Sequence, residues 1–213
     1  MTLAEPESAK GRATRLRILL AAVDVVAEEG AVAATLDSVC ERAEVSRSQL
    51  YHYFDDRADL VHEAVGATAD AVLGFQADHL EHLDSLAGIA IWFDALVARQ
   101  EDCQAHGGCP IGSLIGQLAE RDETARLLLA AALDRWEQQV HEGLLRMRTH
   151  GELAPTADPA RLATATMASV QGGLILTQVR RDPRQLRIAL DGAMTTLLAA
   201  TAPGAEAPPN RPS

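Results

Sequence analysis

A short polar cluster carries the residues of this chain that are best suited to contact another molecule. Arg47, Ser48 and Gln49 stand together, and Tyr51 and His52 follow after one apolar residue. In the DNA major groove, Arg pairs with guanine and Gln with adenine. Backbone N–H groups at a helix start attract phosphate, and a tyrosine hydroxyl can donate to a phosphate oxygen. The cluster therefore predicts a helix start that reads double-stranded DNA.

Two flanking residues extend this candidate surface. Thr35 precedes an apolar helical pattern and is a natural N-cap, and Arg57 stands at the expected start of a later helix, where it can anchor a DNA backbone. The candidate DNA-binding residues are Thr35, Arg47, Ser48, Gln49, Tyr51, His52 and Arg57.

Two short helical patterns joined by a tight turn position this cluster. The first buries residues spaced i, i+3, i+4 and i+7, which are Leu36, Val39, Cys40 and Ala43. The second begins after Val45, with Ser46 as N-cap, and turns Leu50 and Phe54 inward. This layout is typical of a helix-turn-helix.

The same residues resemble a family signature. The run Val45-Ser46-x-x-x-Leu50-Tyr51-x-Tyr53-Phe54-x-x-Arg57-x-x-Leu60 is similar to that of the tetracycline-repressor (TetR) regulators, Gly-Val-Ser-x-x-x-Leu-Tyr-x-His-Phe-x-x-Lys-x-x-Leu. Upstream, Arg17-Ile18-Leu19-x-Ala21-Ala22 and Glu29-Gly30 resemble the family's first helix and its end, so the likeness covers about residues 12–62. Glu44 departs from the usual turn glycine, which requires a residue with a side chain to adopt the turn conformation.

The resemblance implies a homodimeric transcriptional regulator without a cofactor. In this family a small-molecule effector usually binds among the C-terminal helices and releases a repressor from a palindromic operator. Whether the effector releases or strengthens DNA binding in this chain stays open.

Composition and charge limit the alternatives. The 213 residues carry a net charge of −11, and residues 1–57 hold seven basic against ten acidic residues, which leaves −3. This balance argues against a general nucleic-acid binder. Positive charge gathers instead in residues 10–17 and around the polar cluster, where Asp37 and Glu41 are expected to repel phosphate.

The sequence lacks the marks of several other classes of protein. There is no apolar stretch of membrane-spanning length, no apolar core in residues 1–11 for a signal peptide, and an odd cysteine count, so we expect a cytoplasmic protein without membrane contact. An α-helical enzyme is the second hypothesis, but no nucleophile elbow, phosphate loop or zinc motif is present. A DNA-binding adaptor that senses nothing is the third hypothesis.

The remaining pattern is helical, with no period-two strand signal. We expect an all-α protein with an N-terminal three-helix helix-turn-helix domain and a larger C-terminal helical ligand-binding and dimerisation domain. The expected divisions are a flexible arm (1–11), the DNA-binding domain (12–58), the second domain (59–200) and a disordered tail (201–213). Helices are expected at about 14–29, 56–80, 84–101, 110–120, 122–149, 159–180 and 183–200, besides the two of the helix-turn-helix.

The last two helical patterns suggest a dimer interface. Small residues recur on one side of the first, and an apolar stripe runs along the second: Ala165, Ser169, Gly172, Gly173 and Leu176, then Leu186, Leu190, Ala193 and Leu197. A four-helix bundle from two subunits would bury both stripes. The alternative is that they pack within one subunit.

Aromatic and polar side chains of the C-terminal half are candidates for an effector site. Aromatic walls with few polar groups suit a largely apolar ligand, although each residue can equally be ordinary core. The candidates are Trp92, Phe93, Leu96, Cys109, Trp136, Gln139, Met167 and Gln171.

The segment 103–110 offers a second kind of chemistry. Cys109 precedes an expected helix start, which favours a lowered thiol pKa, and Cys103 can serve as a resolving partner in redox or electrophile sensing. Two alternatives stay open: a buried, unreactive Cys109, or a metal site in which His106 and either His79 or His82 join the cysteines.

Overall fold

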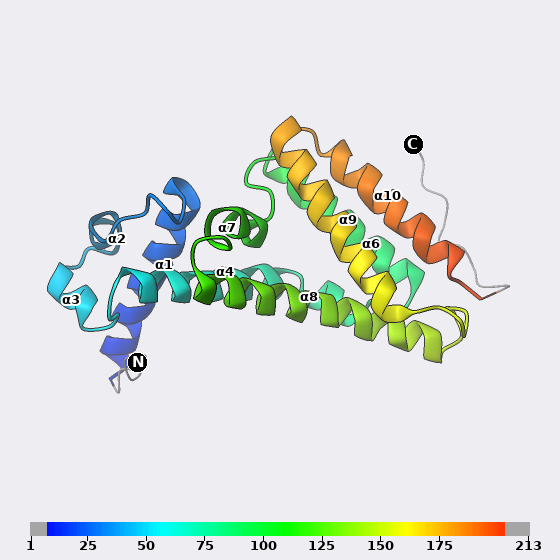
Figure 1. Ribbon diagram of the computed structural model, residues 1–213, viewed down its shortest axis with the longest axis horizontal. Helices are drawn as coiled ribbons and strands as arrows, with labels where there is room; N and C mark the ends of the chain where they lie inside the picture. The colour runs from blue at the N-terminus through cyan, green and yellow to red at the C-terminus, as the bar shows by residue number, and fades with distance from the viewer. Residues whose placement is uncertain (1–7, 203–213) are drawn as a thin grey trace. The chain divides into compact units, whose positions relative to one another are not determined.

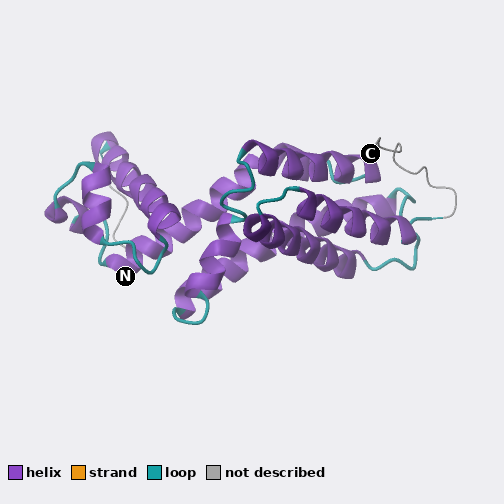
Figure 2. Ribbon diagram, turned by 90° about the horizontal axis from the view of Figure 1, so that it is seen from above, coloured by secondary structure: helices purple, strands orange, loops and turns teal. Residues whose placement is uncertain are grey.

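The computed structural model describes residues 8–202, and within that range the regular structure is helical (Figure 2). The only strand-like pairing there is an isolated bridge between Leu153 and Thr201. The helices are α1 (Ala9–Glu29), α2 (Leu36–Ala43), α3 (Arg47–Tyr51), α4 (Arg57–Phe75), α5 (Ala77–Glu81), α6 (Leu86–Asp102), α7 (Pro110–Leu118), α8 (Glu123–Thr149), α9 (Pro159–Arg180) and α10 (Arg184–Ala199). The all-α prediction is confirmed. Among the described helices, none combines the length and apolar character needed to cross a membrane.

Both ends of the described chain are more ordered than the sequence suggested. Helix α1 begins at Ala9 rather than near residue 14, because Ser8 caps it by accepting from the Gly11 amide at 3.0 Å. At the other end, the Ala202 amide donates to the Glu152 carbonyl at 2.8 Å. The rest of the predicted arm and tail, residues 1–7 and 203–213, lies outside the described residues.

The long helix expected at 56–80 is interrupted at Gln76. This residue has φ −104° and ψ 0°, which separates α4 from the short α5. Its side chain is buried and accepts a hydrogen bond from the Trp92 indole at 2.9 Å. The interruption therefore places a polar side chain in a largely apolar core.

The chain divides into two compact units. The first unit contains the residues up to Val72 and Ser113–Ala132, and the second unit contains Leu73–Gly112 and the residues from Leu133 onward. The division falls within α4, α7 and α8, whereas the sequence suggested a boundary at residue 58.

In the first unit, α1 to α4 enclose a small apolar core (Figure 1). Ile18, Leu50 and Phe54 are fully buried there. Arg15 covers this core from α1, because its guanidinium lies 5.1 Å from the Phe54 ring centroid and pairs with Glu63 of α4. The recognition region is thus fastened to the start of α4 by apolar packing and by charge.

In the second unit, α9 and α10 lie side by side (Figure 1). The apolar stripe of α10 is buried within this single chain, and its residues Leu186, Leu190, Ala193 and Leu197 are at most 5% exposed. The expectation that this stripe faces a second subunit is wrong, because α9 and α6 already cover it. Gly173 permits the close approach, since a Cβ there would lie 2.7 Å from Leu186 Cδ1.

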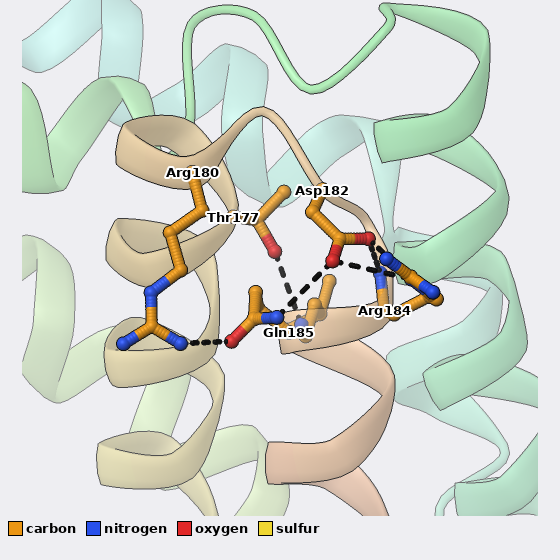
Figure 3. A network of polar contacts seen from close by, with 6 residues as sticks. Thr177, Arg180, Asp182, Arg184 and Gln185 are labelled. Atoms are coloured by element: carbon orange, nitrogen blue, oxygen red, sulfur yellow. Dashed lines mark hydrogen bonds and ion pairs between the residues drawn. The ribbon is translucent and has the colours of Figure 1, made fainter.

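A polar network fixes the turn between α9 and α10 (Figure 3). Asp182 accepts from Arg184 at 2.9 Å and from Gln185 at 3.2 Å, and the Arg184 contact is the main cause that lowers the pKa of this carboxyl to about 2. The Leu186 amide donates to the Thr177 hydroxyl at 3.0 Å. These bonds satisfy helix-end groups and set the register of the two helices.

Asp122 has a comparable role in the first unit, just before α8. It accepts from the Ala125 amide at 2.9 Å and lies 2.8 Å from His62 Nε2 of α4. These contacts, the amide first, hold the pKa of the carboxyl below its ordinary value of 3.8. The folded state therefore binds a proton at Asp122 less readily than the unfolded chain does.

We predict that Asp122→Asn removes an acid-sensitive part of the stability. The contribution of Asp122 is fully present above its unfolded pKa and is lost as pH falls through the lower folded value. The unfolding free energy of the variant should therefore lie below that of the wild type near pH 5, and the gap should shrink toward pH 3. Urea unfolding followed by circular dichroism measures this difference in unfolding free energy. The control is Asp134→Asn, a substitution at an exposed position of α8. A gap that is constant with pH would contradict the prediction.

Candidate nucleic-acid interface and ligand core

The turn between α2 and α3 has the conformation that the sequence required. Thr35 caps α2, because its hydroxyl accepts from the Ser38 amide at 3.1 Å. Glu44 ends α2 in the left-handed region, with φ 52° and ψ 49°. Glu44 thus takes the conformation that glycine adopts at lower cost, as expected for the residue at this turn.

Helix α3 begins with a capping box. The Ser46 hydroxyl accepts from the Gln49 amide N–H at 3.2 Å, and the Gln49 side-chain oxygen accepts from the Ser46 N–H at 3.0 Å. Two amide groups at the helix start are satisfied reciprocally. The Gln49 side chain is consequently held over the N-terminus of α3, with its Nε2 group as the donor left for another partner.

The candidate DNA-binding side chains share one property, which is exposure. The residues are Thr35, Arg47, Ser48, Gln49, Tyr51, His52 and Arg57. Tyr51 keeps 47% of its surface accessible, whereas Leu50 and Phe54 on the same stretch are fully buried. One side of α3 is therefore fixed in the core and the other presents polar groups.

Arg47 is paired with an acidic residue of α2. Its Nε and Nη2 groups each donate to Asp37 at 2.7 Å, and this pairing holds the pKa of the Asp37 carboxyl below its ordinary range. The sequence predicts that Asp37 repels phosphate, but in the free protein its charge is neutralised by Arg47. Both side chains are more than half exposed, so the pair stabilises the fold little.

Arg57 is bound to the protein itself. Its guanidinium donates to the carbonyl oxygens of Ala31 at 2.6 Å, Ala34 at 2.9 Å and Val32 at 3.1 Å. These bonds tie the α1–α2 connection to the start of α4. The sequence suggested a DNA-backbone anchor, and the structure adds a role in positioning Thr35 and the start of α2.

The candidate ligand residues lie in the second unit, and most of them form its core. Six of them are at most 7% exposed: Trp92, Phe93, Leu96, Cys109, Trp136 and Met167. Gln171 is half-buried on α9. Gln139 is exposed on α8 and does not share this core.

The two buried tryptophans differ in their hydrogen bonding. The Trp92 indole N–H donates to Gln76, but the Trp136 indole N–H meets no acceptor among the described residues. The Nε2 group of Gln171 is also buried without a hydrogen bond. The core thus contains two donors without an acceptor.

Cys109 is not the activated thiol that its place before α7 suggested. Burial raises the pKa of the thiol, and the opposing effects are smaller: the Gly112 amide donates to Sγ at 3.4 Å, and the Gln171 amide group lies close by. The expected lowering of the pKa is therefore wrong, because loss of hydration outweighs the helix start. Cys103, the expected resolving partner, is exposed.

The alternative of a metal site finds no support in the geometry. Among residues 8–202, no group of three or more His, Cys, Asp or Glu side chains is arranged to hold a metal ion.

One contact of the first unit was missed by the sequence analysis. Gln117, near the end of α7, accepts from the Ala31 amide at 2.6 Å and donates to the Ser113 carbonyl at 3.2 Å. Its oxygen would lie 2.9 Å from a Cβ at Gly30, which has φ +88°. No local pattern could have indicated this contact, since the residues stand 86 positions apart.

Comparison with known proteins agrees with this geometry. Residues 18–64 match the model of bacterial regulatory proteins of the tetR family, and residues 85–193, just over half of the chain, match the tetracyclin repressor-like C-terminal domain. An uncharacterised helix-turn-helix regulator of Lactococcus lactis is 25% identical over 80% of this chain and 86% of its own length.

Solved structures show the same fold at low identity. A TetR-family regulator from Cytophaga hutchinsonii superposes with a TM-score of 0.81 at 14% identity, covering 92% of this chain and 98% of its own. The complex of SmeT with triclosan has a TM-score of 0.65 at 22% identity, with 94% and 98% covered.

The two family models span the recognition helix and the buried core described above. The chain belongs to the TetR family of helix-turn-helix transcriptional regulators, which bind DNA and are not enzymes.

Proposed function

We propose that this regulator is a homodimeric repressor, which binds a palindromic operator and leaves it when a small, largely apolar ligand enters the second unit. The observation that carries the proposal is the α3 start, where a capping box presents Arg47, Ser48 and Gln49 to solvent. Donors at a helix N-terminus are the groups that reach base edges in the major groove.

Arg47 is the residue to which we assign base or phosphate recognition first. In the free protein it is neutralised by Asp37, and an exposed ion pair of this kind is broken at little cost. On binding, an anionic or acceptor group of the DNA then replaces the Asp37 carboxylate as the partner of Arg47. Gln49 has its side-chain oxygen occupied by the capping box, so we assign it single donation through Nε2 rather than the bidentate contact with adenine.

A second copy of the chain would cover the exposed apolar face of α9 and α10. Ile175 and Val179 of α9 are 55% and 77% exposed, and Ile188 of α10 is 66% exposed. Apolar surface that is gathered on adjacent helices favours association. Two recognition helices are also what a palindromic operator requires, because each half-site occupies one major groove.

The ligand part of the proposal is supported by the buried core of the second unit. Trp92, Phe93 and Met167 supply apolar and aromatic surface there, which suits a small apolar molecule. The similar protein SmeT has been solved with triclosan.

Helix α7 is the element to which we assign transmission of the ligand signal. Its start lies beside Cys109 and Gln171, and its end carries Gln117, which accepts from the Ala31 amide before α2. A ligand that displaces the start of α7 therefore shifts a residue bonded to the α1–α2 connection.

Replacement of Arg47 by Ala tests the DNA-binding assignment. On an operator selected from random DNA, we expect Arg47→Ala to weaken binding by about 1–3 kcal/mol, since one charged contact is lost. Fluorescence anisotropy measures the affinity.

Arg126→Ala is the matched control, because Arg126 forms a similarly exposed pair with Glu123 on α8. This control should bind the operator like the wild type, and both variants should unfold within about 1 kcal/mol of it. Equal affinities for the two variants would remove Arg47 from the interface.

A charged substitution on α9 tests the dimer. Val179→Glu places a carboxylate on the proposed apolar interface, and we expect the dimer to dissociate at micromolar concentration in sedimentation velocity experiments. Ile91→Glu, on α6 and 59% exposed, is the control that should stay dimeric. A dimer that survives Val179→Glu unchanged would show that this face is not the interface.

A further inference from the structure

The two tryptophans of the second unit form a natural comparison. They are the only tryptophans of the chain, and both are at most 1% exposed. The Trp92 indole donates to Gln76 at 2.9 Å, whereas the Trp136 indole N–H has no acceptor among the described residues. A buried donor without an acceptor is costly, so it is rarely retained where nothing ever pairs with it.

A second unpaired donor lies on the neighbouring helix. Gln171 Nε2 is buried and makes no hydrogen bond of ordinary geometry, although the Gln171 amide lies close enough to Cys109 to oppose the rise of its thiol pKa. The Gln171 oxygen lies 3.2 Å from the position of a Cβ at Gly112. Helices α8 and α9 are joined next to Trp136, because Thr164 donates to Glu137 at 2.6 Å. Gln171 follows Thr164 on α9 by about two helical turns. Trp136 thus stands where α8 meets α9, and Gln171 lies on α9 beside the start of α7.

The surroundings indicate the charge of the missing acceptor. Buried apolar side chains stand within about one helical turn of each donor, for example Val140, Met167 and Val170. The buried polar side chains of the described residues are Thr and Gln, and none is charged. Burying an anion among such groups is very unfavourable, whereas a neutral oxygen acceptor needs only a donor.

We propose that Trp136 and Gln171 bind the oxygen acceptor of an uncharged apolar ligand, such as a ketone or an ester. This inference rests on the proposed ligand-controlled function and specifies the chemistry of its site. The indole N–H of Trp136 donates to the ligand oxygen, Gln171 Nε2 supplies the second hydrogen bond, and the apolar side chains cover the rest of the ligand. Trp92 contributes packing but no free donor.

The two indole N–H groups give a direct measurement. In protein with ¹⁵N-labelled tryptophan, two indole resonances are expected, and Trp92→Phe and Trp136→Phe assign them. The probes are acetophenone and isopropenylbenzene. They have the same shape, but the carbonyl oxygen of acetophenone is replaced by a CH₂ group in isopropenylbenzene. We expect acetophenone to move the Trp136 resonance downfield and to leave that of Trp92 in place. Isopropenylbenzene should bind at least roughly tenfold more weakly, since it lacks the acceptor.

The variants provide an independent readout. Trp136→Phe should lower the melting temperature less than Trp92→Phe, because both leave a similar cavity but only Trp136→Phe removes an unpaired donor. It should also reduce the advantage of acetophenone over isopropenylbenzene, leaving the part that Gln171 supplies. Trp92→Phe should lower the melting temperature, since Gln76 loses its donor. Equal shifts with both probes, or no shift at millimolar concentration, would overturn the proposal. A Trp136 indole held by a permanent water that acetophenone does not displace would also overturn it.

Failure of this inference can be told apart from failure of the proposed function. DNA release is measured separately, by anisotropy of the operator complex. If acetophenone binds at Trp136 but releases no DNA, the acceptor-binding site is supported and the proposal that its ligand controls DNA binding is contradicted. If DNA is released equally from the wild type and Trp136→Phe, the ligand acts elsewhere and the acceptor site is wrong.

Discussion

The presentation of DNA-contacting groups depends on how a five-residue helix is held in place. A helix as short as α3 is not stable alone, because nucleation costs more than its few hydrogen bonds return. Here Leu50 and Phe54 fix one side in the core, and the reciprocal bonds of Ser46 and Gln49 close its first turn. The left-handed Glu44 sets the direction in which α3 leaves the turn.

The rest of the first unit supports this arrangement. Arg57 binds three carbonyl oxygens of the α1–α2 connection, and Gln117 binds the Ala31 amide there. Arg15 covers Phe54 and pairs with Glu63. Polar side chains from three helices thus converge on the α1–α2 connection and the base of α3. In our proposal this makes the recognition helix sensitive to movement of α7.

The recognition region was predictable because its determinants are local. The caps of α2 and α3, the left-handed turn residue and the inward Leu50 all follow from residues fewer than ten positions apart. The pairing of Arg47 with Asp37 was not foreseen, because the turn geometry decides whether the two side chains meet. Asp37 was therefore interpreted as a repulsive charge.

The second unit was harder to predict because its helices have apolar residues on more than one side. Leu190 and Ile188 are both apolar residues of α10, yet the first is buried by α9 and α6 and the second is exposed. Periodicity cannot decide which side meets a helix of the same chain. Likewise, Cys109 was placed correctly before a helix, but its burial was not visible in the sequence, and burial determines its pKa.

Sequence-selective DNA recognition is tested by binding of the purified protein to its own upstream intergenic DNA. The measurement is fluorescence anisotropy across a salt series, with scrambled DNA as control. We expect selective binding by two protomers or a multiple of two, with an affinity that falls steeply as salt rises. Equal binding to scrambled DNA at every salt concentration, together with no site from genome-wide selection, would contradict it.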